Sequence, residues 1–209
     1  MLTPKEKYSK EQFERDLKNP GLEHIKDRET FKGFYDRLGE MDIQKTQKYK
    51  DWRMKFIYPK GKIIELGCHA GFDLIVYAKR GFEITGVDIS TSLLELAKGK
   101  ISQQPEEVQK RITLINSFIE DLPEDKKYDT IILTETLEHV QNPVPVLKKA
   151  KNLLAKNGRI FISTPSQREG NYSHVRGISP FEMHALLNIA DFTALEVYKK
   201  KNLTFAIAR

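Results

Sequence analysis

Residues 135–139 read Glu-Thr-Leu-Glu-His and carry the groups best suited to acid–base chemistry. They directly follow a predicted strand, where a polar side chain reaches a ligand most easily. His139 has an ordinary pKa of about 6.5, so it could act as a general base near neutral pH, beside Glu138. Alternatively, Glu138 and His139 only cap and order the loop. Both interpretations stay open at this point.

The same residues also suit a divalent metal ion. Glu135, Glu138 and His139 stand at i, i+3 and i+4, which share one face if the segment is helical. His174 follows a later predicted strand and could supply a fourth ligand from across the site. A metal there would lower the pKa of a substrate hydroxyl and orient it. An ordinary loop histidine is the competing interpretation of His174.

A small-residue loop followed by an acid predicts a nucleoside site. The loop at residues 65–71 reads ELGCHAG, and its small residues let the backbone approach a ligand closely. Asp88 ends the next predicted strand, 21 residues after Gly67, where it could accept hydrogen bonds from both hydroxyls of a ribose. A dinucleotide loop would have glycines at the positions of His69 and Phe72. The loop therefore suits a pyrophosphate poorly.

Alternating strands and helices must position these groups. Apolar runs predict strands at residues 62–66, 82–87, 112–115, 128–133 and 159–163, with helices between them. Ser90, Asn142 and Ser179 are predicted helix caps, while Gly81 and Asn157-Gly158 are predicted stops. Strands at 194–199 and 203–208 lie too close for a crossover, so they should pair antiparallel. The expected fold is a doubly wound, mostly parallel, seven-stranded α/β sheet with an antiparallel C-terminal strand.

Composition limits the class of protein. The 209 residues suit one domain, and the single cysteine, Cys68, excludes an internal disulfide. The first residues contain no apolar run typical of a signal peptide, and no stretch approaches the ~20 apolar residues of a membrane span. A cytoplasmic protein is therefore expected.

The first 60 residues are predicted to form a helical cap or lid on the main domain at residues 61–209. Residues 1–62 hold +5 of the formal charge of +6, and lysines there alternate with Tyr49, Trp52 and Phe56. Basic and aromatic side chains together suit nucleic acid. The three rings also fall at i, i+3 and i+7, a helical stripe that would be buried. The buried stripe is favoured, because this periodicity is its commoner cause.

Four motifs, IIELGCHAGFDL, GVDIS, FIEDLP and TETLEHV, resemble those of class I S-adenosylmethionine-dependent methyltransferases, in particular the ubiquinone-biosynthesis O-methyltransferase branch. The resemblance covers residues 60–209, including RIFISTP, and leaves out the leader. It implies a Rossmann-like fold, S-adenosylmethionine as cofactor, and methyl transfer to a hydroxyl of a small molecule or sugar.

The resemblance also implies roles for residues of the cofactor site. The loop at 65–71 would hold the methionine moiety, Asp88 the ribose, and Thr134 the methionine amino group. Ile89, Phe118 and Ile119 would flank the adenine. Two positions depart from the family, since His69 replaces a usual glycine and Phe118 a frequent aspartate. The implied cofactor-binding residues are Glu65, Gly67, Cys68, His69, Gly71, Asp88, Ile89, Phe118, Ile119 and Thr134.

The acidic motif resembles, in addition, the metal site of small-RNA 3′-terminal ribose methyltransferases. The implied ligands of Mg or another divalent metal are Glu135, Glu138, His139 and His174. Two alternatives follow, a metal-assisted RNA ribose methyltransferase and an inactive cofactor-binding scaffold. Neither is favoured, because no RNA-binding module is recognisable and both Asp88 and the glycine loop are intact. The acceptor would be chosen by the leader and residues 167–178.

Overall fold

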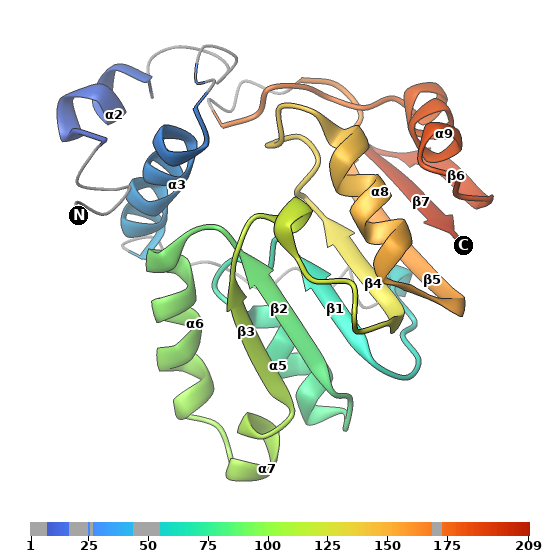
Figure 1. Ribbon diagram of the computed structural model, residues 1–209, viewed down its shortest axis with the longest axis horizontal. Helices are drawn as coiled ribbons and strands as arrows, with labels where there is room; N and C mark the ends of the chain where they lie inside the picture. The colour runs from blue at the N-terminus through green and yellow to red at the C-terminus, as the bar shows by residue number, and fades with distance from the viewer. Residues whose placement is uncertain (1–7, 17–24, 26, 44–54, 169–172) are drawn as a thin grey trace.

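Seven strands form one sheet in the order β3-β2-β1-β4-β5-β7-β6 (Figure 1). A computed structural model describes residues 8–16, 25, 27–43, 55–168 and 173–209. Strands β1 to β5 pair in parallel, and β7 is antiparallel to both β5 and β6. This arrangement confirms the predicted fold class. The strands are β1 Ile63–Leu66, β2 Ile84–Asp88, β3 Ile112–Asn116, β4 Tyr128–Thr134, β5 Leu154–Pro165, β6 Ala194–Lys200 and β7 Leu203–Ala208.

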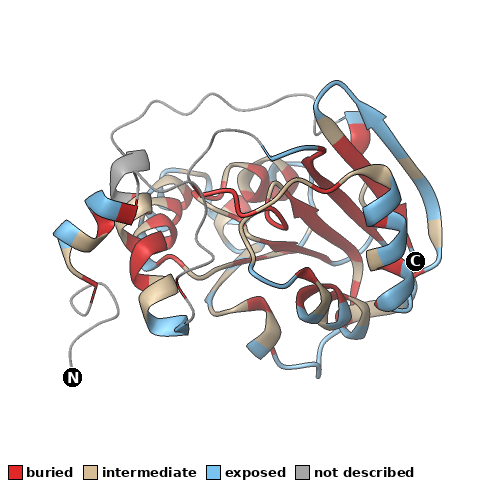
Figure 2. Cartoon of the chain, turned by 90° about the horizontal axis from the view of Figure 1, so that it is seen from above, coloured by how far each residue is buried: buried red, intermediate tan, exposed pale blue. Residues whose placement is uncertain are grey.

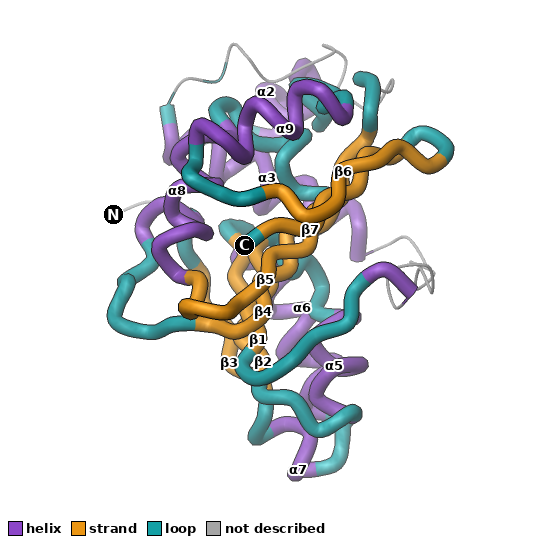
Figure 3. Tube along the Cα trace, turned by 90° about the vertical axis from the view of Figure 1, so that its right-hand side faces the viewer, coloured by secondary structure: helices purple, strands orange, loops and turns teal. Residues whose placement is uncertain are grey.

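Helices cover both faces of the sheet (Figure 3). One face packs against α8, α9 and the 3-10 helix η1, and the other against α5, α6 and α7. None of the helices among the described residues is long and apolar enough to cross a membrane. The helices are α2 Lys10–Asp16, α3 Arg28–Ile43, α5 Phe72–Lys79, α6 Thr91–Ser102, α7 Glu106–Gln109, η1 Ile119–Asp121, α8 Pro143–Leu153 and α9 Pro180–Ile189.

Alternating side chains of the central strands supply the two cores. Ile64 of β1 points to the α8 side, whereas its neighbour Ile63 points to the α5 side. Ile131 and Ile132 of β4 divide in the same way. Because successive residues of a strand face opposite sides, a strand buried on both faces is apolar throughout. The central strands accordingly form the buried centre of the molecule, whereas β6 at the rim is mostly exposed (Figure 2).

Three predicted caps are confirmed, and one predicted helix end is wrong. Ser90 Oγ accepts from Leu93 N, Asn142 caps α8, and Ser179 forms a capping box with Glu182. Helix α8, however, ends at Leu153 and does not continue to Asn157-Gly158. Leu154 is already extended and pairs with Tyr128 of β4, so sheet pairing ends the helix before the glycine does.

The N-terminal helices α2 and α3 lie beyond the carboxyl ends of the strands (Figure 1). Helix α3 packs closely on α6, since a Cβ atom added at Gly39 would lie 2.8 Å from Ser90 Oγ. Tyr8, Phe34 and Tyr35 belong to a separate aromatic core between α2, α3 and Val175. The cap therefore has an apolar core of its own and is attached directly above the strand ends.

The stripe expected at Tyr49, Trp52 and Phe56 is only partly within the described residues. Tyr49 and Trp52 lie outside them. Phe56 is buried, and its ring makes edge contacts with Phe161 and Phe205, at centroid distances of 5.8 and 4.8 Å. The burial of Phe56 agrees with the apolar interpretation of this position.

Candidate functional site

The sheet reverses its order between β1 and β4, and both sequence-identified groups follow these two strands. The chain runs from β1 to β2 on one side and from β4 to β5 on the other. Ligands of open α/β sheets bind where the loops diverge at such a reversal. Residues 65–71 and 135–139 flank this point, so the topology brings the two predicted sites together.

The loop after β1 is held against β2 by its own backbone. The amides of Gly67 and Cys68 both donate to Val87 O, at 2.8 and 2.9 Å. Gly67 has a φ of 85°, and a Cβ there would lie 2.4 Å from Thr136 Oγ1. Glycine is thus required by the backbone conformation and by Thr136, in addition to any ligand.

Asp88 is fixed by two backbone donors, one from each side of the site. His69 N donates to Asp88 Oδ2 at 2.8 Å, and Ser90 N donates to Oδ1 at 2.9 Å. His69 has a φ of 50°, a left-handed conformation that favours glycine. Desolvation raises the pKa of Asp88 above its ordinary value, while the bonds from Ser90 and His69 lower it. The carboxylate is therefore held in one orientation.

Thr134 presents a buried hydroxyl to the site. It ends β4 and is 4% exposed, and within the described part of the chain its Oγ1 has no hydrogen-bond partner. Such a buried hydroxyl is costly unless a ligand or water satisfies it. Glu65 is equally buried, across the loop. Cys68 is buried as well, and burial, then the charges of Asp88 and Glu65, raise the pKa of its thiol.

The three residues assigned to adenine have different surroundings. Ile119 lies in the main core beside Leu122, whereas Ile89 is partly buried and packs against the aromatic core of the cap. The ring of Phe118 lies 4.0 Å below the guanidinium of Arg28. Ile89 and Phe118 line a surface pocket that α3 completes.

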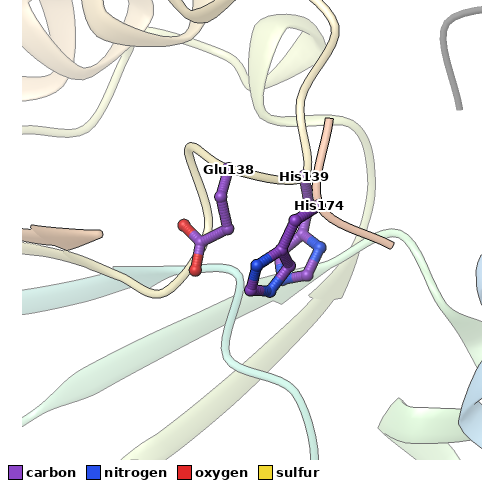
Figure 4. Close-up of side chains that lie close together, drawn as sticks. All are labelled: Glu138, His139 and His174. Atoms are coloured by element: carbon purple, nitrogen blue, oxygen red, sulfur yellow. The ribbon is translucent and has the colours of Figure 1, made fainter. Parts of the chain in front are cut away.

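Glu138, His139 and His174 lie close together, with Glu138 and His174 buried and His139 partly buried (Figure 4). One candidate ligand atom from each residue lies within 4.8 Å of the others. The two imidazole rings meet edge to face, with centroids 4.8 Å apart. The turn at residues 137–139 and a distant loop thus bring together three side chains that can exchange a proton or bind a cation.

Backbone and hydroxyl groups orient this site. His139 Nδ1 lies 3.0 Å from Ser173 O, and because a carbonyl oxygen can only accept, Nδ1 is the donor in this contact. Glu138 Oε2 accepts from Thr164 Oγ1 at 3.0 Å, and Val175 N donates to Glu138 O at 2.8 Å. These contacts restrain the imidazole of His139 and the carboxylate of Glu138.

Glu135 does not join the group, because the assumed helix does not form. Residues 137–139 form a turn, and Glu135 has a left-handed φ of 53°, which no helix accommodates. Its carboxylate accepts from Ser163 Oγ at 3.1 Å instead. The predicted i, i+3, i+4 face is therefore wrong, and Glu138 and His139 reach His174 by another route. Of the remaining histidines, His184 is exposed on α9 and His24 lies outside the described residues.

Sequence reasoning missed the contribution of α3. Arg28, Lys32, Tyr35 and Asp36 all contact the loops that follow the strands. Tyr35 Oη lies 3.5 Å from His139 O, and burial, then the charges of Glu138 and Asp88, raise its pKa. Their spacing of i, i+4, i+7 and i+8 puts them on one helix face, a signal that was present in the sequence.

Known proteins resemble both the sequence and the fold. A family model described as a methyltransferase domain matches residues 41–197. The chain belongs to this methyltransferase family. The match confirms the enzyme class expected from the sequence, an S-adenosylmethionine-dependent methyltransferase, and supports it over the RNA and scaffold alternatives.

Relatives and solved structures agree with this assignment. The methyltransferase is 27% identical over 173 residues to a ubiquinone biosynthesis O-methyltransferase of Vibrio campbellii, covering 71% of this chain and 72% of the relative. It is 36% identical over 118 residues to the one of Coxiella burnetii, covering 54% and 49%. An S-adenosylmethionine-dependent methyltransferase from Methanosarcina mazei has the same fold, with a TM-score of 0.64, 17% identity, and coverage of 78% and 98%.

We predict that Gly67→Ala destabilises the methyltransferase by about 1–3 kcal/mol, because the new Cβ strains a positive φ and meets Thr136. Urea denaturation measures this loss. Gly99→Ala is the matched control: Gly99 lies in α6 with nothing within 4 Å of an added Cβ, so alanine should stabilise by about 0.5–1 kcal/mol. Equal effects of both variants would contradict the role assigned to Gly67.

Proposed function

We propose that this methyltransferase transfers the methyl group of S-adenosylmethionine to a hydroxyl of a small molecule or sugar in the cytoplasm. The observation that supports it best is the placement of Asp88 and the Glu138–His139–His174 group around one sheet reversal. One half suits a nucleoside cofactor and the other suits removal of a hydroxyl proton. The names of the relatives, O-methyltransferases, support the same acceptor class.

The residues after β1, β2 and β4 fit the cofactor. Asp88 would accept from both ribose hydroxyls, since its carboxylate is already oriented by His69 N and Ser90 N. The unsatisfied Thr134 Oγ1 and the buried Glu65 would meet the polar methionine end. When bound, the cofactor supplies a methyl group activated by its sulfonium. The protein then has mainly to align the acceptor oxygen with that methyl carbon.

His139 Nε2 is the proposed base. It would take the proton of the acceptor hydroxyl, and the imidazole would become cationic. The bound cofactor would supply the methyl group by cleavage of its methyl–sulfur bond, which leaves a neutral thioether. Glu138 lies beside it and would stabilise this charge. The carbonyl of Ser173 accepts from Nδ1–H and so restrains the orientation of the imidazole.

The same three side chains fit a divalent metal, which is the other proposed use of the group. Two imidazoles and one carboxylate suit Mn, Fe or Zn better than Mg, which prefers oxygen ligands. A bound ion would lower the pKa of the acceptor hydroxyl. Because Nδ1 of His139 is already engaged, Nε2 can be either the metal ligand or the base. The two roles of His139 therefore exclude each other.

The assignment of Asp88 predicts a loss of cofactor affinity in Asp88→Asn. Hydrogen bonds to a charged group contribute about 1.5–3 kcal/mol each, so the dissociation constant of S-adenosylhomocysteine should rise about 100-fold. Isothermal titration calorimetry measures the change. Asp125→Asn, an exposed site on the loop before β4, is the control and should bind like the wild type. No binding by the wild type, or full binding by Asp88→Asn, would disprove the proposed cofactor site.

Cofactor affinity should also fall as the pH is lowered. The ionised carboxylate accepts from both ribose hydroxyls, and a protonated one cannot. Because desolvation raises the pKa of Asp88, the loss should begin at a higher pH than for an ordinary aspartate. Titrations with S-adenosylhomocysteine from pH 7.5 to 4.5 test this, and a pH-independent affinity would be evidence against it. Asp88→Asn should lack this pH dependence.

Metal binding is expected to depend on Glu138 and His174. Titration with Mn²⁺ should give a binding isotherm that is lost in Glu138→Gln and in His174→Ala, because each removes one ligand atom. Mg²⁺ should bind more weakly than Mn²⁺. Glu135→Gln is the control and should retain binding, since Glu135 lies outside the group. An absence of Mn²⁺ binding to the wild type excludes the metal and leaves His139 as base.

A further inference from the structure

Helix α3 contributes a row of polar side chains to the rim of the cofactor site. The contacts reach three separate loops, at the ends of β2, β3 and β4. They are made by Arg28, Lys32, Tyr35 and Asp36. In Figure 1, α3 lies beside the carboxyl ends of these strands. Helix α3 therefore contacts the loops of the site directly.

Arg28 fixes the position of Phe118. Its two terminal nitrogens lie 3.2 and 2.7 Å from the carboxylate oxygens of Asp121, and its plane lies 4.0 Å from the centre of the Phe118 ring. The ion pair is half exposed, so it adds little to overall stability. Its fork geometry, however, restrains both the ring and the start of η1.

Lys32 ties the ends of β2 and β3 together. Its Nζ donates to Ile89 O, to Thr91 Oγ1 at 3.3 Å and to Asn116 Oδ1 at 3.0 Å. Asn116 Nδ2 in turn donates to Asp88 O at 3.0 Å and to Ile89 O at 2.9 Å. The backbone of Asp88 and Ile89 is thereby connected through Asn116 to α3.

These contacts enclose a pocket beside Asp88. Its lining includes Arg28, Lys32, Ile89, Asn116, Phe118 and Asp121. An aliphatic and an aromatic side chain with polar groups around them suit a flat heterocycle with a hydrogen-bonding edge. An anion is disfavoured, since Arg28 is paired with Asp121 and Lys32 is surrounded by three acceptors.

We propose that α3 forms the outer wall of the adenine subsite, with Arg28 and Lys32 as positioning residues for Phe118 and Ile89. The inference rests on the proposed cofactor role of Asp88, because adenine must lie next to the ribose that Asp88 would bind. Helix α3 is then part of the cofactor site itself.

Calorimetry with two ligands tests the proposal in the full-length protein. S-adenosylhomocysteine and 5′-methylthioadenosine share the adenosine group, and only the first has the amino-acid end. Arg28→Met and Lys32→Met should raise both dissociation constants about fivefold, because the loss is at the adenine end. Arg28→Lys should lie between wild type and Arg28→Met. Asp121→Asn, which breaks the same ion pair from the other side, should weaken binding in the same direction.

Arg159→Met is the matched control. Arg159 also lies over an aromatic ring, that of Tyr58, and its partner Thr130 is near the start of β4, away from the site. It should bind both ligands like the wild type, and thermal melts should show all variants folded.

Unchanged affinity in Arg28→Met and Lys32→Met overturns the proposal, as does weaker binding of S-adenosylhomocysteine alone, which would place the effect at the methionine end. If instead the wild type binds neither ligand, or Asp88→Asn binds both normally, the proposed cofactor site is contradicted. The role proposed for α3 is then contradicted too, because it rests on that site.

Discussion

The site depends on the two backbone hydrogen bonds that hold the carboxylate of Asp88. His69 N comes from the loop after β1, and Ser90 N comes from the start of α6. The carboxylate of Asp88 therefore connects two neighbouring βα units at the carboxyl ends of β1 and β2. The hydrogen bond from His69 N also gives a reason for the left-handed φ of His69, because in that conformation the amide of His69 points at Asp88. A histidine in place of glycine is accepted there at some conformational cost.

On the proposed acceptor side, a turn is held by contacts with a segment that is distant in the sequence. Glu138 and His139 belong to a turn, and a distant segment supports them: Ser173 O accepts from the imidazole, and Val175 N donates to Glu138 O. Tyr35 lies where the charges of Glu138 and Asp88 both act on its hydroxyl. Tyr35 of α3 thus lies between the proposed cofactor half and the proposed acceptor half.

The sequence was sufficient to predict the strand–helix alternation, most caps and the positions of Asp88 and the glycine loop, because these follow from local patterns. It was insufficient where tertiary contacts override local ones. The end of α8 is set by pairing of Leu154 with β4, and the turn at Glu135 replaces an expected helix. The contacts of Arg28 and Lys32 depend on how α3 docks, which Gly39 permits by its close approach to Ser90. The sequence pattern of α3 by itself does not indicate how this helix docks on α6.

The support behind His139 and Glu138 is made by main-chain atoms of residues 173 and 175. Main-chain carbonyl and amide groups are present whatever side chains stand at those positions, except that proline at 175 would lack the donor. The side chains at these two positions can therefore differ while the main-chain contacts to His139 and Glu138 are kept. The orientation of the proposed base is in this respect independent of the side chains that stand next to it.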